Sequence, residues 1–254
     1  MKTRESFESA ARRQWLRPRA VVQLGAALLV AGACMLVSQG AGAESATKLP
    51  PPLIDTALSA AGGQQTVVFA GGCFWGVQAV FQHTRGVVQA VSGYAGGGRD
   101  TATYERVSSG ATGHAESVQV MFDSRQVTFG KLLQIYFSVA HDPTQLNRQG
   151  PDTGSQYRSA VFYTDASQRQ LAERYIAQLE GAHVFPAKIV TQLIALSGFY
   201  PAEAYHQNYA TLHPDASYIA MFDRPKIASL KDLFPDVYQD VPVLVATRMN
   251  GQAK

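Results

Sequence analysis

The segment FAGGCFWG, residues 69–76, joins the two kinds of element from which the fold is expected to be built. Before it, residues 66–70 (TVVFA) form a β-branched apolar run, which predicts a buried strand. After it, residues 73–83 (CFWGVQAVFQH) carry apolar side chains at helical spacing. The two glycines end the strand, let the backbone turn sharply and leave room for a substrate to approach. We therefore predict a strand, a Gly-Gly turn and a helix that begins at Cys73.

The rest of the chain alternates in the same way between strand and helix patterns. We predict further strands at residues 86–97, 114–122, 158–165 and 187–196, and helices at 128–141, 167–181 and 201–213. Thr128 is expected to cap its helix, and Pro201 to occupy the first position of the last one. This order is typical of an α+β domain with helices packed on a mixed or antiparallel sheet. The long irregular stretch at 141–157 is of a kind that is often functional.

The first 43 residues are interpreted as an export signal. Basic residues precede an apolar run at 20–37, and Ala41 and Ala43 supply a small-residue cleavage site. Arg12 and Arg13 resemble the twin-arginine signal of bacteria, which predicts a periplasmic or secreted protein. An ordinary secretory signal and an uncleaved inner-membrane anchor remain open. A lipoprotein site at Cys34 is disfavoured, because Ala31 stands where leucine is expected.

Cleavage after residue 43 would change both the charge and the cysteine content. Six of the 22 basic and two of the 19 acidic residues lie in the signal, which leaves 16 basic and 17 acidic ones. Nucleic acid is therefore not indicated as a partner. Cys73 would be the one remaining cysteine, so it could not form an intrachain disulfide. It is either an inert core residue or a working thiol.

The predicted position of Cys73 favours the working thiol without deciding the question. Unpaired N–H groups and the positive end of the helix dipole favour a thiolate at a helix start. Free cysteines are, however, also among the most buried residues. Phe74 and Trp75 are either core residues or the walls of a pocket for a small apolar group.

Glu116 lies in the strand predicted at 114–122. Strand alternation places it on the more apolar face, with Val118, Val120 and Phe122. A carboxyl group on that face is desolvated, so its pKa should rise and it can act as a general acid. An exposed position at the strand end is the alternative.

The other candidates are weaker when each is taken alone. Tyr104 and Tyr157 can be packing residues, Asp152 can cap a turn in the long loop, and His206 can orient a neighbour. The histidines show no zinc-type spacing, and neither a P-loop nor a dinucleotide fingerprint is present.

Four segments in order resemble the peptide methionine-S-sulfoxide reductase family, the A-type methionine sulfoxide reductases. They are GCFWG (72–76), GHAESVQV (113–120), HDPTQLNRQGPDTGSQYRS (141–159) and YPAEAYHQNY (200–209). The resemblance implies a single two-layer domain with a ferredoxin-like core. We expect a linker at 44–65, the reductase domain at 66–222 and an extended C-terminal arm at 223–254.

The resemblance also implies roles for the candidate residues. Cys73 would attack the sulfoxide sulfur, and Glu116 would protonate the sulfoxide oxygen. Tyr104 and Tyr157 would hydrogen-bond that oxygen, and Asp152 would help to hold the polar end of the site.

The same resemblance concerns substrate binding and recycling. Phe74 and Trp75 would enclose the S-methyl group of methionine sulfoxide, free or in oxidised proteins, with His206 as a supporting neighbour. No metal or organic cofactor is implied, and a monomer is expected. Many relatives carry resolving cysteines, which this C-terminal arm lacks, so a thioredoxin-like protein or a small thiol must reduce the Cys73 sulfenic acid.

One further departure and two alternatives stay open. Ala204 replaces an acidic residue that is common before the Tyr-His pair, which places a supporting contact in doubt. A cysteine hydrolase or acyltransferase that uses Cys73 with His206, and a module that binds oxidised methionine without turnover, are the competing hypotheses.

Overall fold

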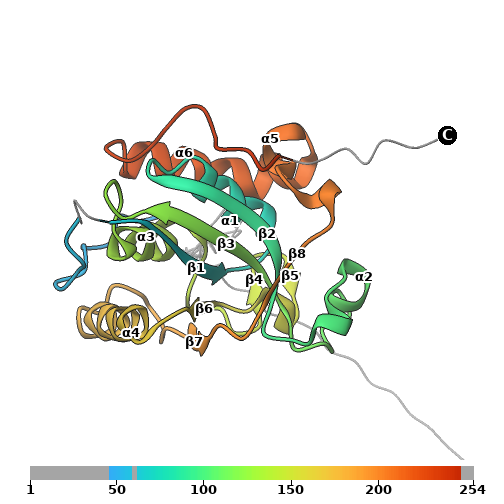
Figure 1. Ribbon diagram of the computed structural model, residues 1–254, viewed down its shortest axis with the longest axis horizontal. Helices are drawn as coiled ribbons and strands as arrows, with labels where there is room; N and C mark the ends of the chain where they lie inside the picture. Colours follow the sequence, from blue (N-terminus) through green and yellow to red (C-terminus); the bar gives the residue numbers. More distant parts are fainter. Residues whose placement is uncertain (1–45, 59–61, 247–254) are drawn as a thin grey trace, which may run out of the picture. The chain divides into compact units, whose positions relative to one another are not determined.

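The computed structural model describes residues 46–58 and 62–246. Six strands form a mixed sheet in the order β7-β6-β1-β3-β2-β8 (Figure 1). Their bounds are β1 Gln64–Ala70, β2 Val87–Ala95, β3 Ala115–Asp123, β6 Ala160–Tyr163, β7 Gln192–Ala195 and β8 Phe199–Pro201. The pairs are antiparallel except for β6 with β7. The short strands β4 Arg148–Gln149 and β5 Asp152–Thr153 form a separate hairpin.

Helices occupy most of the connections between these strands. The α-helices are α1 Phe74–Gln82, α2 Tyr104–Val107, α3 Phe129–Ile135, α4 Ala166–Gly181, α5 Tyr209–Leu212 and α6 Arg224–Leu233. Three 3₁₀ turns (η1 Arg99–Thr101, η3 Ser155–Tyr157, η4 Ala204–His206) and two π-helical turns (η2 Tyr136–Ala140, η5 Ile219–Asp223) complete the set. The predicted cap of α3 is confirmed, since the side chain of Thr128 accepts a hydrogen bond from the N–H of Lys131.

The centre of the sheet has the ferredoxin-like arrangement. In chain order β1, α1, β2, β3, α3 and β6 form the core, and its four strands stand side by side as β6-β1-β3-β2. This is the split β-α-β pattern in which both helices cross on the same face of an antiparallel sheet. The predicted α+β fold is therefore confirmed.

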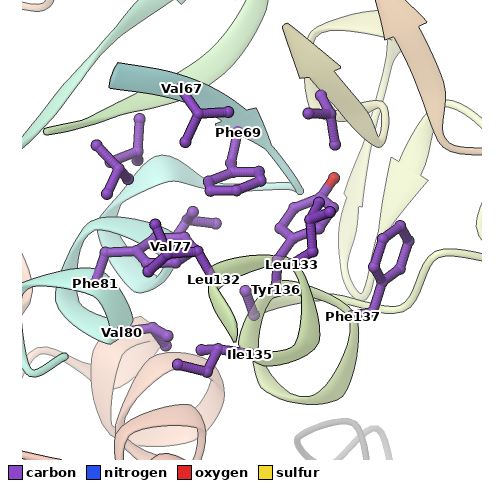
Figure 2. Close-up of a cluster of buried hydrophobic side chains, with 14 of the residues drawn as sticks. Val67, Phe69, Val77, Val80, Phe81, Leu132, Leu133, Ile135, Tyr136 and Phe137 are labelled. Carbon is purple, nitrogen blue, oxygen red and sulfur yellow. The ribbon is translucent and has the colours of Figure 1, made fainter. Parts of the chain in front are cut away.

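Strand alternation assigns the two faces of this sheet. Val67 and Phe69 of β1 face α1 and α3, and Figure 2 shows them above the apolar side chains of these helices. Val68 and Ala70 lie in a smaller cluster on the opposite face. On β3, Val118 and Val120 belong to the helix-facing core, whereas Ala115 belongs to the other cluster. Glu116, two residues before Val118, must therefore point towards the helices.

The Gly-Gly turn between β1 and α1 is required by its surroundings. Gly72 has φ +87°, and a Cβ there would lie 2.5 Å from Cγ of Gln149. A Cβ on Gly71 would meet the ring of His141 at 2.9 Å. The close approach that the glycines permit is thus made by side chains of the 141–157 loop rather than by a substrate.

The helix predicted at 201–213 is wrong. Residues 199–201 form β8, which pairs with β2 at the edge of the sheet, so that Pro201 lies opposite Gly93. An edge strand tolerates proline, because one side of the strand needs no ladder hydrogen bonds. Asn208 then adopts φ 59°, a left-handed conformation that separates η4 from α5.

The segment predicted as a linker, residues 44–65, contacts the domain at several of the residues that the structure describes. Leu49 is buried, and its carbonyl oxygen accepts a hydrogen bond from Gln134 at 2.7 Å. The hydroxyl of Tyr175 on α4 donates to the carbonyl of Pro50. Asp55 accepts the N–H of Gly130 in the first turn of α3. Apolar burial and these hydrogen bonds hold the segment on the domain. The predicted signal at 1–43 lies outside the described residues.

The C-terminal arm is not simply extended. Residues 224–233 form α6, and Leu230 and Phe234 are completely buried in the main core. The predicted domain end at residue 222 therefore cuts through packed structure. Among the helices of residues 46–58 and 62–246, none is long and apolar enough to cross a membrane.

Candidate active site

A cavity of about 170 Å³ lies at the start of α1. Its lining residues are Cys73, Phe74, Trp75, Tyr104, Glu116, Asp152, Tyr157 and Tyr218. All of these except Tyr218 were predicted from the sequence. Larger cavities of about 400 and 670 Å³ lie along α4, but their walls contain no cysteine. The chemistry of the lining residues, rather than cavity size, identifies the site.

Cys73 occupies the N-cap position of α1 and is a free, buried thiol. Burial raises its pKa well above the ordinary value, and the charges of Glu116 and Asp223 raise it further. The N–H of Trp75 opposes this shift but does not overcome it. The expectation that the helix start favours a thiolate is therefore wrong, because desolvation and nearby carboxylates outweigh the helix end.

Glu116 is buried on the helix-facing side of β3, with 3% of its surface exposed. Its Oε2 accepts the backbone N–H of Phe74 at 3.1 Å, so the carboxyl group also satisfies the first free donor of α1. Desolvation outweighs that hydrogen bond and raises the pKa of Glu116 to about 8. The sequence-based prediction of a desolvated carboxyl with a raised pKa is confirmed.

Tyr104 and Tyr157 bring two hydroxyl groups to the same cavity from different segments. Tyr104 begins α2, and Tyr157 ends η3 at the close of the 141–157 loop. Burial and the neighbouring Glu116 raise the pKa of both phenols, so both remain hydrogen-bond donors at neutral pH. These donors can bind an oxygen atom on which negative charge develops.

Asp152 lies on β5 and accepts a 2.5 Å hydrogen bond from the hydroxyl of Tyr218. Burial raises the pKa of Asp152 from its ordinary value. Tyr218 was not identified from the sequence. Its ring also meets Trp75 edge-on, with centroids 6.0 Å apart, so it connects the polar and the aromatic walls.

The aromatic wall is fixed from behind by η4 and α5. Nε1 of Trp75 donates to Nδ1 of His206 at 3.3 Å. The indole stacks on the ring of Tyr209, with ring centroids 3.9 Å apart. Burial lowers the pKa of His206, so its ring is a neutral acceptor. The ring of Phe74 packs on the same imidazole, with ring centroids 5.1 Å apart. His206 therefore contacts both Phe74 and Trp75, as expected of a supporting residue.

Glu203 is a second supporting residue that the sequence reasoning missed. One carboxylate oxygen accepts the hydroxyl of Tyr94 at 2.8 Å, and the other accepts the backbone N–H of Tyr104 at 2.9 Å. It thereby connects β2 to the start of α2. The doubt raised by Ala204 concerned an acidic contact at this place, and the neighbouring Glu203 makes one.

Residues 65–236 match the family model described as peptide methionine sulfoxide reductase. The chain belongs to the peptide methionine sulfoxide reductase family. The peptide methionine sulfoxide reductase MsrA 2 of Mesorhizobium japonicum is 57% identical over 191 residues, which cover 75% of this chain and 98% of that protein. The MsrA of Natronomonas pharaonis is 50% identical over 171 residues, or 67% of this chain and 96% of that protein.

Solved structures of this family share the fold. Methionine sulfoxide reductase A of Corynebacterium diphtheriae aligns with a TM-score of 0.53 at 33% identity, and covers 70% of this chain and 91% of that chain. Reduced Mxr1 of Saccharomyces cerevisiae aligns with a TM-score of 0.55 at 30% identity, over 63% of this chain and 94% of that chain. The chain is therefore an enzyme of the peptide methionine sulfoxide reductase class.

Proposed function

We propose that this reductase uses Cys73 as nucleophile and Glu116 as general acid to convert methionine-S-sulfoxide, free or in proteins, into methionine. The observation that supports the proposal is one cavity that combines a buried thiol with a carboxyl group whose pKa is about 8. At neutral pH such a carboxyl group holds a proton that it can give to a poor leaving group.

In the proposed reaction each of these groups has a separate role. The Cys73 sulfur attacks the sulfoxide sulfur while Glu116 gives its proton to the sulfoxide oxygen, which Tyr104 and Tyr157 hold by hydrogen bonds. The thiol proton of Cys73 passes to the same oxygen through Glu116, so the oxygen leaves as water and the sulfur–oxygen bond of the substrate breaks, with Cys73 bonded to the substrate sulfur. Water then attacks the Cys73 sulfur, the sulfur–sulfur bond breaks and methionine leaves with the bonding electron pair, while the proton released by the water restores Glu116. Thiol and sulfoxide thus give sulfenic acid and thioether without net loss of protons.

The walls of the cavity fit the remaining parts of the substrate. Phe74 and Trp75 offer an apolar surface for the S-methyl group, and Asp152 with Tyr218 forms the polar side. The proposed preference for the S epimer rests on the relationship to the family.

The sulfenic acid must be reduced by a thiol from outside the chain. Cys73 is the one cysteine in residues 46–58 and 62–246, and it is free. Two external thiols would return Cys73 to its thiol form, with release of water and formation of their own disulfide. A thioredoxin-like protein and a small thiol are the two classes of reductant, and the enzyme is expected to act as a monomer.

The proposed location is outside the cytoplasm, where the enzyme would repair oxidised proteins. The basic and apolar pattern of residues 1–43 and its twin-arginine-like pair support export, with an inner-membrane anchor as the alternative. The N-terminal sequence of the protein isolated from its host distinguishes the two, since cleavage after Ala43 would give a chain that begins at Glu44.

The test of the activity is methionine formation by the purified protein. We expect one equivalent of methionine per enzyme without reductant, a trappable Cys73 sulfenic acid, and turnover when dithiothreitol is added. Cys73→Ser should abolish reduction, because a hydroxyl group is a poor nucleophile for this sulfur. Binding of methionine sulfoxide without any methionine formation would instead support the non-catalytic module. Hydrolysis of thioesters with no reduction would support the hydrolase.

A further inference from the structure

Asp223, the last residue of η5, is a buried carboxyl group that the chemistry above does not use. None of its surface is exposed. Neither carboxylate oxygen has a hydrogen-bond donor among the residues that the structure describes. A buried carboxylate without such donors is costly for folding, so its position calls for a physical reason.

The first turn of α1 provides the space for this carboxyl group. Gly76 lies three residues after Cys73, and a Cβ on Gly76 would be placed 2.1 Å from Oδ1 of Asp223. The missing side chain at Gly76 therefore lets Asp223 pack against the backbone of the helix that carries the thiol. Asp223 is not among the residues that line the cavity, so it contacts the first turn of α1 from outside the cavity wall.

Several ionisable groups surround Asp223, and one of them is a cation. Nζ of Lys226, one helical turn later on α6, is 3.8 Å from Oδ1 of Asp223, and the lysine side chain is itself largely buried. The ionisable groups that interact with Asp223 are Cys73 at the N-cap of α1, Glu116 on β3, Asp152 on β5, Tyr218 before η5 and Lys226 on α6. Burial raises the pKa of Asp223 to about 6, so the group is largely ionised at neutral pH.

We propose that Asp223, with Lys226 as its counter-ion, is a positioning residue that holds Cys73 in the thiol form from its place against the first turn of α1. A helix start would otherwise favour the thiolate. An anion beside the same helical turn opposes the positive helix end and disfavours a second negative charge on the sulfur. Burial is the main cause that raises the pKa of Cys73, Glu116 and then Asp223 raise it further, and Asp152 in the cavity wall contributes less.

The consequence concerns the enzyme between turnovers. A thiolate is the form of cysteine that oxidants attack, and residues 46–58 and 62–246 hold no second cysteine that could capture a Cys73 sulfenic acid as a disulfide before further oxidation. A thiol kept protonated reacts slowly with oxidants, whereas a sulfoxide in the cavity is protonated by Glu116 and can be attacked. The inference rests on the proposed function only in taking Cys73 as the nucleophile.

The test measures the thiol directly and needs no turnover. The rate of Cys73 alkylation by iodoacetamide is followed from pH 6 to 10 in the full-length protein and in Asp223→Asn. We expect the variant to alkylate about tenfold faster at pH 7, which corresponds to the one-unit shift that a nearby charge commonly causes. Asp232→Asn, an exposed change on α6, should leave the profile unchanged. If Asn impairs folding, Asp223→Leu removes the same charge at similar volume.

Lys226→Met tests the counter-ion. Without the lysine, Asp223 should become protonated near neutrality, so alkylation at pH 7 should increase in the chain that retains Asp223 and stay unchanged in the Asp223→Asn background. An equal effect of Lys226→Met in both backgrounds overturns the pairing. An unchanged or slower alkylation in both Asp223 variants overturns the proposal, even if methionine formation by the parent enzyme is normal. If the alkylation rates change as expected but the parent enzyme forms no methionine, the proposed function is overturned instead.

Discussion

Single residues in this site gain their properties from burial as much as from their chemical type. Cys73 and Glu116 are both protonated near neutrality, because desolvation raises both pKa values. In the proposed reaction a sulfoxide therefore meets a proton donor and a soft nucleophile together. The neutral imidazole of His206 adds no charge to the cavity and serves to orient Trp75.

The pH dependence of the first chemical step depends on Glu116. Its pKa of about 8 means that the acid is present below pH 8 and is lost as the pH rises through that value. We expect the rate of the first methionine equivalent in the parent enzyme to decline above pH 8. Glu116→Gln should slow this step by at least roughly tenfold and remove that decline, since an amide cannot titrate. Single-turnover methionine formation from pH 6 to 9.5 measures both. Full activity of the variant at pH 7 would contradict the assignment of Glu116.

At the scale of elements, local patterns predicted what short-range physics controls. The alternation along β3 placed Glu116 on the helix-facing side, and Thr128 capped α3 as its type suggests. The same reasoning gave a helix at 201–213, where pairing with β2 determines the structure. Pairing with a distant strand depends on tertiary contacts, which a local window of sequence does not contain.

In the candidate site, too, residues within local motifs were predicted, whereas residues that act through contacts between elements were not. Cys73 and Glu116 were identified from local pattern and resemblance together, because each lies within a conspicuous motif. Tyr218, Glu203 and Asp223 were missed, since their roles arise from contacts with Asp152, Tyr104 and Gly76 in other elements. One available signal was Lys226, which follows an acidic residue by three positions and so places the pair on one side of a helix.

The tight contact between α1 and Asp223 gives a prediction for one glycine. Gly76→Ala would place a methyl group 2.1 Å from Oδ1 of Asp223, so either the carboxyl group or α1 must shift. We expect a loss of about 1–3 kcal/mol in unfolding free energy, together with lower activity because Cys73 lies on the same turn. Gly181→Ala in the last turn of α4 is the control, since nothing lies within 4 Å of its new methyl group. Urea unfolding of both variants is the measurement. Equal stabilities would mean that Asp223 does not pack against Gly76.

On the scale of the whole domain, the segments on either side of the core are structural parts of it. Residues 46–58 fasten α3 and α4 through Leu49, Pro50 and Asp55. After α6, the chain returns to the far end of α1, where the N–H of Val243 donates to the carbonyl of Gln82 and Asn208 bonds to Val245. The helix that carries Cys73 is thereby held at both of its ends by residues from the last quarter of the chain.

Truncation tests whether the domain can end at residue 222. Ending the chain after Phe222 would remove Leu230 and Phe234, which are both fully buried, and also Asp223 and Lys226. Loss of two such side chains exposes their partners in the core and costs roughly 5–10 kcal/mol if each contributes as in large-to-small substitutions. That range is comparable with the total stability of an ordinary domain. We therefore expect a chain without a cooperative thermal transition.

Two other truncations distinguish the contribution of α6 to stability from that of the segment that follows it. A chain that stops after Ala246 keeps every contact described for the C-terminal region, so its midpoint of thermal unfolding should match that of the full-length protein. A chain that stops after Pro235 keeps α6 and Phe234 but loses the hydrogen bonds of Val243 and Val245 near α1. We expect it to fold with an intermediate midpoint, because it retains the apolar burial and loses exposed and half-buried hydrogen bonds that contribute about 1 kcal/mol each. Cooperative unfolding of the chain ending at Phe222, with a midpoint close to that of the Pro235 chain, would show that α6 covers the core without stabilising it.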